Sequence, residues 1–232
     1  MVRRVMKVWG IGLATLMLSS LAAAAEPAAT QPADASDWRK VVSTFAADHF
    51  KNPAWGFSHC QRDYQLAREL AAADRVKLDD DVLYAAAYLH DMAAFEPWEK
   101  SGVDHADRAA ELVDTVLQKT GFPMKKIDAV RGAIRTHMFD RDPKGPEALY
   151  LHDADALDWL GAIGVARIFG LVDARGGNPT GPEVVPMLEK NLAEVPARVL
   201  SPAGKARVSE RSEQLAKFLQ QLRAQTGGLR LL

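Results

Sequence analysis

From Trp38 onward, apolar residues recur at helical spacing, and the alternation of Val, Ile and Thr typical of strands is nearly absent. Polar residues that favour helix N-termini precede several periodic segments: Ser58, Asp80 and Asp104 are expected to cap the second, third and fourth helices. Gly121 is expected to end the fourth. The pattern predicts an all-α fold with helices over residues 37–50, 58–73, 80–92, 104–120, 125–138, 147–169, 183–192 and about 202–226.

The first 25 residues differ in kind from the rest. Three basic residues precede an apolar stretch over residues 8–18, and small residues follow as far as Ala25. This is the pattern of a secretory signal peptide, with cleavage expected before Glu26. The alternative is an uncleaved membrane anchor, but the apolar stretch is short for a span. Residues 26–36, rich in Ala and Pro, are expected to form a flexible tether. We therefore expect a periplasmic or secreted protein that is free of the membrane after cleavage.

Composition narrows the remaining classes. The chain has 232 residues, 48% of them hydrophobic, which is enough for a sizeable core. Its net charge of -1 provides no broad basic surface for a nucleic-acid polymer. Cys60 is the only cysteine, so an internal disulfide is excluded, and it is expected to be a packing residue. We expect one helical domain over residues 37–175 and a C-terminal helical extension over 176–232 that packs on it. The sequence leaves the oligomeric state open.

The histidines fall at distinctive places. In the apolar stretch AAAYLHDMAAF, His90 and Asp91 are adjacent, and a buried charge is costly unless it is paired or bound to a metal. His137 continues the apolar stripe of its predicted helix, while His59 and His105 each begin one. We expect these rings to point inward from converging helix ends, around a metal. His49 is expected at the surface or in a loop, and His152 stays undecided.

Carboxylates occur in a second apolar stretch, LHDADALDWLGAIGVAR. Asp155 and Asp158 are three residues apart and share a helix face, in apolar surroundings where at least one carboxylate needs a cation. Each feature also has an ordinary interpretation. A histidine on an apolar face is more often a hydrogen-bonded core residue, and the DAD stretch is compatible with a solvated turn or helix start. The ordered set of histidines and aspartates is the stronger indication.

That ordered set, in WGFSHCQRDYQLAREL, AAAYLHDMAAF and LHDADALDWLGAIGVAR, resembles the HD-domain metal-dependent phosphohydrolases over about residues 48–170. The resemblance implies an HD-domain-like helical bundle. It also implies two groups of residues. The metal ligands would be His59, His90, Asp91 and Asp155, with Asp155 preferred to Asp153 because the family's late aspartate precedes the turn written here as Ala-Leu-Asp. His105 and His137 match the extra histidines of members that hold a second metal or bind phosphate.

The implied function is hydrolysis of a small phosphorylated substrate, a phosphomonoester or phosphodiester, by metal-activated water. The ligand set suits one or two divalent ions of Mn, Fe, Co, Ni or Zn. Asp91 would bridge two ions, and Arg62 would contact the phosphate, unless it forms a surface ion pair with Asp63 or Glu69. Arg135 and Arg167 are weaker candidates. The GYP motif of the cyclic-dinucleotide branch is absent, which argues against that substrate.

Two other functions stay open. The same ligands resemble those of di-iron oxygenases with an HD fold, and the chain is also compatible with a non-catalytic, metal-stabilised binding protein of the cell envelope. Five aromatic residues flank the motifs and would either line a substrate pocket or belong to the core: Trp55, Phe57, Tyr88, Phe95 and Trp98.

Overall fold

The computed structural model describes residues 36–232, so the predicted signal peptide and nearly all of the predicted tether lie outside the described residues. Nine α-helices and three short 3-10 turns make up the secondary structure of this part, with no strand, which confirms the all-α prediction. The helices are α1 (Ser36–His49), α2 (Phe57–Ala73), α3 (Asp80–Leu89), α4 (His105–Leu117), α5 (Ile127–Arg135), α6 (Pro146–Asp158), α7 (Gly161–Phe169), α8 (Gly181–Glu194) and α9 (Pro202–Gln225). The 3-10 turns are η1 (Met92–Ala94), η2 (Met124–Lys126) and η3 (Val195–Arg198).

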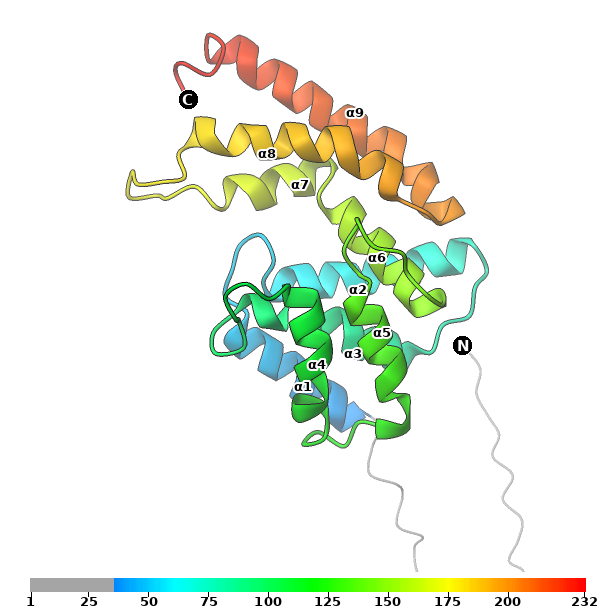
Figure 1. Ribbon diagram of the computed structural model, residues 1–232. Coiled ribbons are helices and arrows are strands. Elements are labelled where there is room, and N and C mark those ends of the chain that lie inside the picture. The colour runs from blue at the N-terminus through cyan, green and yellow to red at the C-terminus, as the bar shows by residue number, and fades with distance from the viewer. Residues whose placement is uncertain (1–35) are drawn as a thin grey trace, which may run out of the picture. The chain divides into compact units, whose positions relative to one another are not determined.

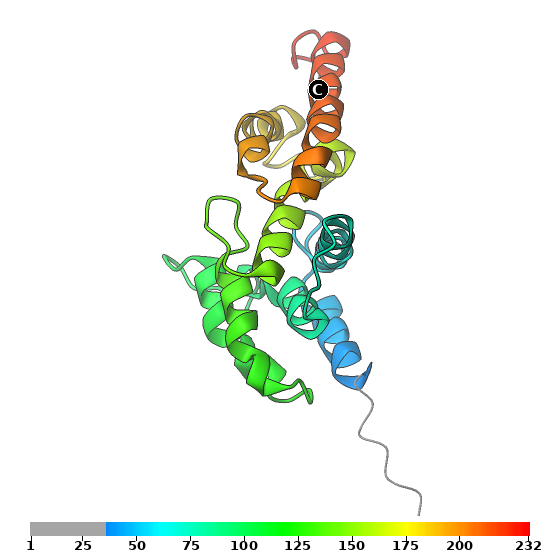
Figure 2. The ribbon, with the colours of Figure 1, turned by 90° about the vertical axis from the view of Figure 1, so that its right-hand side faces the viewer.

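The helices form two groups that α6 connects. Figures 1 and 2 show α1 to α5 on one side and α7 to α9 on the other. Helix α6 packs on α2, α3 and α5 in the first group and on α7 and α9 in the second. The C-terminal helices therefore pack on the bundle, while the domain boundary at residue 175 stays a prediction. None of the helices in residues 36–232 is both long and apolar enough to cross a bilayer.

Apolar stripes explain the packing. Helix α3 lies at the centre, because seven of its ten residues are buried. Helix α9 has one narrow stripe, in which Leu215 and Leu219 are buried and Phe218 and Leu222 pack against the core. Burial of such side chains contributes about 1.5–3 kcal/mol each. The long C-terminal helix is thus held by its spaced leucines and one aromatic ring.

The predicted helix over residues 147–169 is wrong, because the structure breaks it into α6 and α7. Leu160 is extended, with φ -109° and ψ 166°, and Gly161 has φ +67°, a left-handed conformation that favours glycine. Behind the break, a Cβ at Gly164 would lie 2.2 Å from the carbonyl oxygen of Trp159. Glycines at 161 and 164 therefore allow a sharp bend in a segment whose apolar pattern runs on.

Other helix ends also differ from the predictions. Asp104 caps α4 as predicted, but Asp79 rather than Asp80 caps α3. At α2, Gly56 takes the N-cap position in place of Ser58. The position requires glycine, because a Cβ there would lie 2.4 Å from the carbonyl oxygen of Asn52. Gly121, with φ +91°, lies beyond a turn that follows α4.

Helix α3 ends earlier than predicted, at Leu89 instead of residue 92. His90 is its C-cap, and Asp91 leaves the helical conformation with φ -97° and ψ 9°. Helix α5 likewise ends at Arg135, so His137 follows the helix rather than belonging to it. The motif side chains are therefore presented by helix ends and the turns after them.

Candidate metal centre

Three buried histidine rings are held in the same way. The Nδ1 atom of His59 lies 2.9 Å from Asp158 Oδ2 and donates a hydrogen bond to that carboxylate. The rings of His90 and His137 each donate from Nδ1 to the backbone carbonyl three residues earlier, over 2.9 and 2.6 Å. A ring that donates from Nδ1 keeps its lone pair on Nε2, the tautomer that binds metals.

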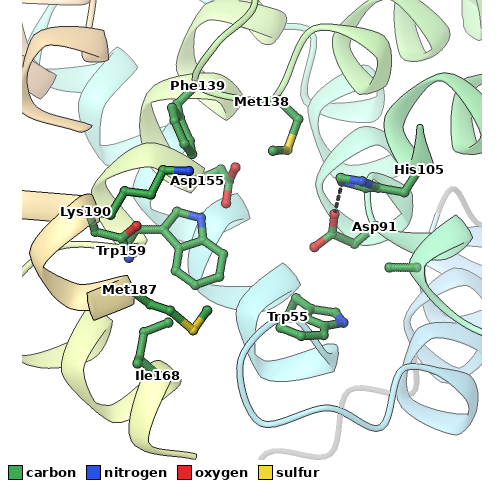
Figure 3. Close-up of a pocket in the computed structure, with 12 residues that line it drawn as sticks. Trp55, Asp91, His105, Met138, Phe139, Asp155, Trp159, Ile168, Met187 and Lys190 are labelled. Carbon is green, nitrogen blue, oxygen red and sulfur yellow. Dashed lines mark ion pairs between the residues drawn. The ribbon is translucent and has the colours of Figure 1, made fainter. Parts of the chain in front are cut away.

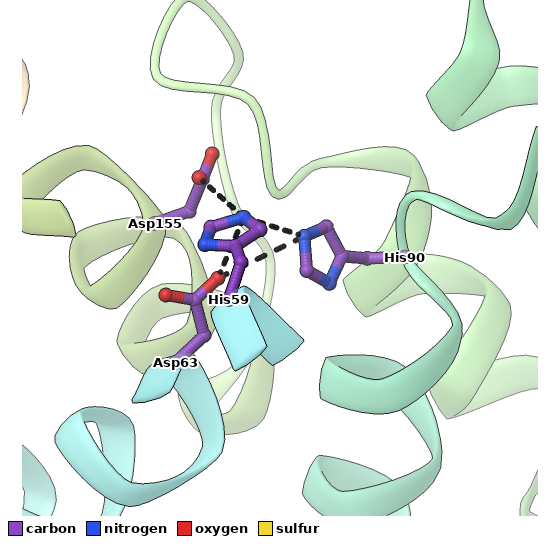
Figure 4. Close-up of side chains that lie close together, drawn as sticks. All are labelled: His59, Asp63, His90 and Asp155. Carbon is purple, nitrogen blue, oxygen red and sulfur yellow. Dashed lines mark hydrogen bonds and ion pairs between the residues drawn. The ribbon is translucent and has the colours of Figure 1, made fainter. Parts of the chain in front are cut away.

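Four donor groups come together around His59. Its Nε2 atom lies 3.1 Å from Asp63 Oδ2, 3.3 Å from Asp155 Oδ1 and 3.2 Å from His90 Nε2 (Figure 4). All four donor atoms lie within 4.8 Å of one another. Neighbouring ligands at about 2.1 Å from one ion are themselves about 3.0 to 3.4 Å apart. The first cluster, His59, Asp63, His90 and Asp155, therefore has the spacing of a metal site.

A second cluster adjoins the first through His90. It comprises His90, Asp91 and His137, with donor atoms within 4.8 Å of one another. Asp91 Oδ2 lies 3.3 Å from His90 Nε2, whereas its Oδ1 lies 3.5 Å from His137 Nε2 and 3.3 Å from His105 Nε2. The two oxygens of Asp91 thus point to different histidines, as a carboxylate shared by two ions would require.

The electrostatics fit a cation. Burial alone would raise the pKa of Asp91, but the neighbouring imidazoles, His90 first and then His105 and His137, hold that pKa well below its usual range. Burial raises the pKa of Asp63 well above its usual range, helped by the nearby carboxylates. Both oxygens of Asp63 and Nε2 of His137 are buried without a hydrogen-bond partner. Imidazole nitrogens and carboxylate oxygens facing one another in a dry interior are suited to a divalent ion.

Asp158 supports the first cluster from behind. Its carboxylate accepts from His59 and from Arg62, whose Nε and Nη2 atoms lie 3.0 and 2.9 Å from its two oxygens. The Nη1 atom of Arg167 lies 3.0 Å from the same carboxylate, and the Arg167 guanidinium covers the Trp159 ring at 3.6 Å. Burial would raise the pKa of Asp158, but these partners hold it well below the usual range.

Arg62 therefore has a role that differs from both sequence expectations. It pairs with Asp158, rather than with Asp63 or Glu69, and it does not line the pocket beside the clusters. Arg135 is half exposed and lies 3.7 Å from Asp107. Neither arginine is among the residues that line that pocket.

A cavity of about 470 Å³ opens beside the two clusters (Figure 3). Asp91, Asp155 and His105 are the motif residues in its wall. Apolar and aromatic side chains form most of the remainder, and α8 of the C-terminal group contributes three residues. The lining comprises Trp55, Asp91, Ala94, His105, Met138, Phe139, Asp155, Trp159, Ile168, Met187, Lys190 and Asn191.

Of the five flanking aromatic residues, only Trp55 lines this cavity. Phe95 stacks on Phe50 in the core, with ring centroids 4.9 Å apart, and Trp98 packs edge-on beside them. The remaining two, Phe57 and Tyr88, pack on each other. The core interpretation therefore fits four of the five.

The remaining candidates lie apart from the clusters. Asp153 accepts from the backbone N–H groups of Leu200 and Ser201, so of the two late aspartates it is Asp155 that lies in the first cluster. His152 is buried, with Nδ1 3.0 Å from Asp153. His49 is exposed and Cys60 is buried and free.

Sequence reasoning missed two kinds of residue. Asp63 follows His59 by four residues, so helical spacing alone could have placed it on the same face. Lys190 and Asn191 have no motif, and their place in the cavity wall depends on how α8 packs. The Nδ2 atom of Asn191 is buried without a hydrogen-bond partner. Only tertiary structure reveals such groups.

A helical bundle that gathers buried histidines and aspartates beside a pocket is characteristic of metal-binding α-proteins. Comparison with known families gives the type of domain. Residues 56–160 match the model of the HD domain. The chain carries an HD domain and has the fold of the HD-superfamily hydrolases, so the resemblance predicted from its motifs is confirmed.

Solved structures agree over most of the chain. A predicted HD-superfamily hydrolase from an uncultured Thermotogales bacterium is 25% identical, with a TM-score of 0.57 over 82% of this chain and 92% of that one. Bacillus subtilis YpgQ in complex with ADP is 20% identical, with a TM-score of 0.60 over 81% and 97%. An HD-superfamily hydrolase from Bacillus thuringiensis is 22% identical, with a TM-score of 0.58 over 83% and 96%. No curated protein sequence matches the chain.

Proposed function

We propose that this protein is a metal-dependent phosphohydrolase that acts on a small phosphorylated molecule. The observation that carries the proposal is the position of the clusters: Asp91 and Asp155 belong to them and also line the cavity wall. A substrate in the cavity would therefore meet the metal-binding residues directly. The HD-domain match supports the same reaction class.

Different residues would bind the metal, orient a ligand and contact the phosphate. When bound by His59, His90, Asp91 and Asp155, a divalent ion would lower the pKa of a bound water and neutralise negative charge on the phosphoryl group. Asp158 holds the His59 ring in the metal-binding tautomer. His105, whose side chain is 30% exposed, lies at the cavity wall and can donate a hydrogen bond to a phosphate oxygen there.

The ligand types indicate the class of ion. Imidazole and carboxylate together suit Mn²⁺, Fe²⁺, Co²⁺, Ni²⁺ or Zn²⁺ better than Ca²⁺, which prefers oxygen ligands alone. The two adjoining clusters support a pair of ions, with Asp91 between them. A pair of ions can stabilise both the attacking and the leaving oxygen of a phosphoryl transfer.

The cavity supports a substrate with an apolar or aromatic part. Trp55, Phe139 and Trp159 lie in its wall, and Lys190 from α8 is placed to meet a negative charge (Figure 3). A volume of about 470 Å³ suits a small molecule. The B. subtilis relative binds ADP, a phosphorylated small molecule, on the same fold.

We also propose that the protein works in the cell envelope, in the periplasm or after secretion. The support is the sequence of residues 1–25 alone, with its basic start, apolar middle and small residues before Glu26. Mass spectrometry of the protein purified from its native cells would show an N-terminus at Glu26. An intact N-terminus in the cytoplasmic fraction would contradict the proposal.

The test of the enzymatic proposal combines metal analysis with a phosphate-release assay. The purified protein is stripped of metal, reloaded with each candidate ion in turn, and given p-nitrophenyl phosphate and a panel of nucleotides. We expect activity with at least one ion, and its loss in His90→Ala and Asp91→Ala. The exposed His49→Ala is the matched control and should retain activity.

Two results would favour the other functions. Dioxygen consumption by the iron-loaded protein, without phosphate release, would favour a di-iron oxygenase. Metal binding with no turnover of any substrate, and a biological role that survives both variants, would favour a metal-stabilised binding protein.

A further inference from the structure

We infer that Asp63 is a ligand of the ion held by His59, His90 and Asp155. This inference rests on the proposed metal site and deepens it. The resemblance to the family implies Asp91 as the fourth residue of that set. In the structure, however, the group of four whose donor atoms all lie within 4.8 Å of one another contains Asp63 and not Asp91.

The geometry comes from a single turn of α2. Asp63 follows His59 by four residues, so both side chains lie on one face of the helix. Asp63 Oδ2 lies 3.1 Å from His59 Nε2 and 3.7 Å from His90 Nε2 (Figure 4). These separations are near the roughly 3.0 to 3.4 Å expected between neighbouring ligands of one ion.

The surroundings of Asp63 provide an independent argument. Its side chain has no exposed surface, and neither oxygen has a hydrogen-bond partner. The two buried aspartates outside the clusters are satisfied by the protein: Asp153 by two backbone N–H groups and Asp158 by arginine and histidine. Burying an unpaired carboxylate is costly, so a cation at the first cluster explains why the core retains one here.

The assignment changes what the site prefers. Asp63 adds a hard oxygen ligand and a negative charge to a pair of imidazoles and Asp155. Carboxylate-rich sites favour Mn²⁺ relative to sites made of softer ligands. Asp63 adds to Asp91 rather than replacing it, because Asp91 Oδ2 lies 3.6 Å from His59 Nε2 and 3.3 Å from His90 Nε2, while its Oδ1 lies 3.5 Å from His137. The first cluster then has two carboxylates of its own, Asp63 and Asp155.

The experiment compares three variants in the full chain. Asp63→Asn removes the charge at nearly constant shape, and Asp63→Val replaces the carboxylate with an apolar group in case the amide disturbs folding. Asp153→Asn is the matched control, because it alters a buried carboxylate that lies outside the clusters. Circular dichroism and urea unfolding of the metal-free proteins establish that each is folded.

The readouts are Mn²⁺ affinity by calorimetry and the visible spectrum of the Co²⁺-loaded protein, which reports the coordination of the ion. Loss of residues that merely orient ligands costs about 10- to 100-fold in affinity, so removing a ligand should weaken Mn²⁺ binding at Asp63→Asn and Asp63→Val by about 100-fold or more. Their Co²⁺ spectra should change as well, while Asp153→Asn retains wild-type affinity and spectrum.

The outcomes separate this inference from the function on which it rests. Wild-type affinity and an unchanged Co²⁺ spectrum in both Asp63 variants would overturn the role of Asp63 and leave the metal site standing. Equal loss of affinity in Asp153→Asn would also overturn it, because the effect would then be general to buried carboxylates. A wild-type protein that binds none of the candidate ions would overturn both.

Discussion

At the scale of single residues, Asp158 decides how the first cluster is presented. One carboxylate orients the His59 ring and pairs with two arginines, Arg62 and Arg167. It donates nothing to a metal, yet it fixes which nitrogen of His59 faces the cluster. An aspartate to which the family resemblance assigned no role thus orients the ring of a residue 99 positions earlier in the chain.

Replacing Asp158 by asparagine should weaken the site and the fold together. We expect Asp158→Asn to lower metal affinity by about 10- to 100-fold, as loss of a ring-orienting carboxylate does. Because Arg167 is buried, the loss of its counter-charge should also cost roughly 3 kcal/mol of unfolding free energy. Calorimetry and urea unfolding measure the two effects. Asp142→Asn, at an exposed ion pair with Lys144, should change neither.

The sequence indicated the chemical types of the site residues better than their partners. His59, His90 and Asp155 could be placed together because their motifs are local and their order along the chain resembles that of a known family. The partner of Arg62 could not be predicted, since Asp158 lies 96 residues away and is brought close only by the packing of α2 on α6. Asp63 was visible as a neighbour of His59 on one helix face, but spacing alone does not show burial.

At the scale of secondary-structure elements, the bend between α6 and α7 is what separates the HD bundle from the C-terminal group. The prediction of one continuous helix was wrong here because the spacing of apolar residues does not reveal a single residue in the left-handed conformation. Gly161 interrupts the helix while Leu157, Leu160 and Ile168 keep the apolar spacing intact and buried. The helical structure of α6 and α7 was therefore predictable, but the change of direction between them was not.

The bend makes Gly164 sensitive to the smallest side chain. A Cβ there would lie 2.2 Å from the Trp159 carbonyl oxygen, so the backbone must shift, and we expect Gly164→Ala to cost at least about 2 kcal/mol of unfolding free energy. Gly132 lies in α5 with no atom within 4 Å of an added Cβ. Gly132→Ala should therefore stabilise by about 0.4–1 kcal/mol. Similar values for the two variants in urea unfolding would contradict this account.

Ion pairs that join α1, α3 and η2 should make stability depend on pH. Arg39 and Lys126 lie 2.7 and 2.8 Å from Asp81. Burial would raise the pKa of Asp81, but hydrogen bonds from Lys126 and Arg39 outweigh it and lower the pKa below its ordinary value.

A carboxyl whose pKa is lower in the folded state contributes stability above the unfolded pKa of about 3.9, and this is lost as pH falls through the folded value. Asp81 is partly exposed, so we expect Asp81→Asn to cost only about 1 kcal/mol at pH 7. The difference from wild type should shrink as pH falls below about 4. A difference that stays constant from pH 7 to pH 3 would argue against the ion pairs.

Helix α8 should affect substrate binding rather than metal binding. Lys190 is the lysine in the cavity wall, and its side chain is 66% exposed. Lys190→Ala should raise KM for a phosphate ester about fivefold, the equivalent of about 1 kcal/mol, with little change in kcat or metal affinity. Lys205→Ala, at an exposed position on α9, is the control and should leave KM unchanged. A fall in kcat alone would argue against a binding role.

At the scale of the whole molecule, the site is assembled from α2, the end of α3, the turn after α5, and α6, and α8 completes the cavity. An ion that binds only the folded chain stabilises it by mass action. At a concentration 100 times the Kd, the gain is about 2.7 kcal/mol, or about 5–10 °C in Tm for a chain of this size.

Calorimetric scans with a chelator, and then with Mn²⁺ in excess, should show this difference in wild type. It should shrink in His59→Ala, which removes a ligand of the first cluster. Equal Tm values with and without metal in the wild-type protein would contradict a metal site in the core.

The position of Arg167 on α7 limits where the chain can be truncated. The stretch that matches the HD family stops at residue 160, whereas Arg167 lies beyond it on α7 and is completely buried. From there it reaches back to Asp158 and to the carbonyl of Ala54. A gene cut after codon 160 would encode a polypeptide lacking one of the cations that balance Asp158. The family segment is thus not a portable module in this chain, and engineering or grafting it elsewhere should carry α7 along.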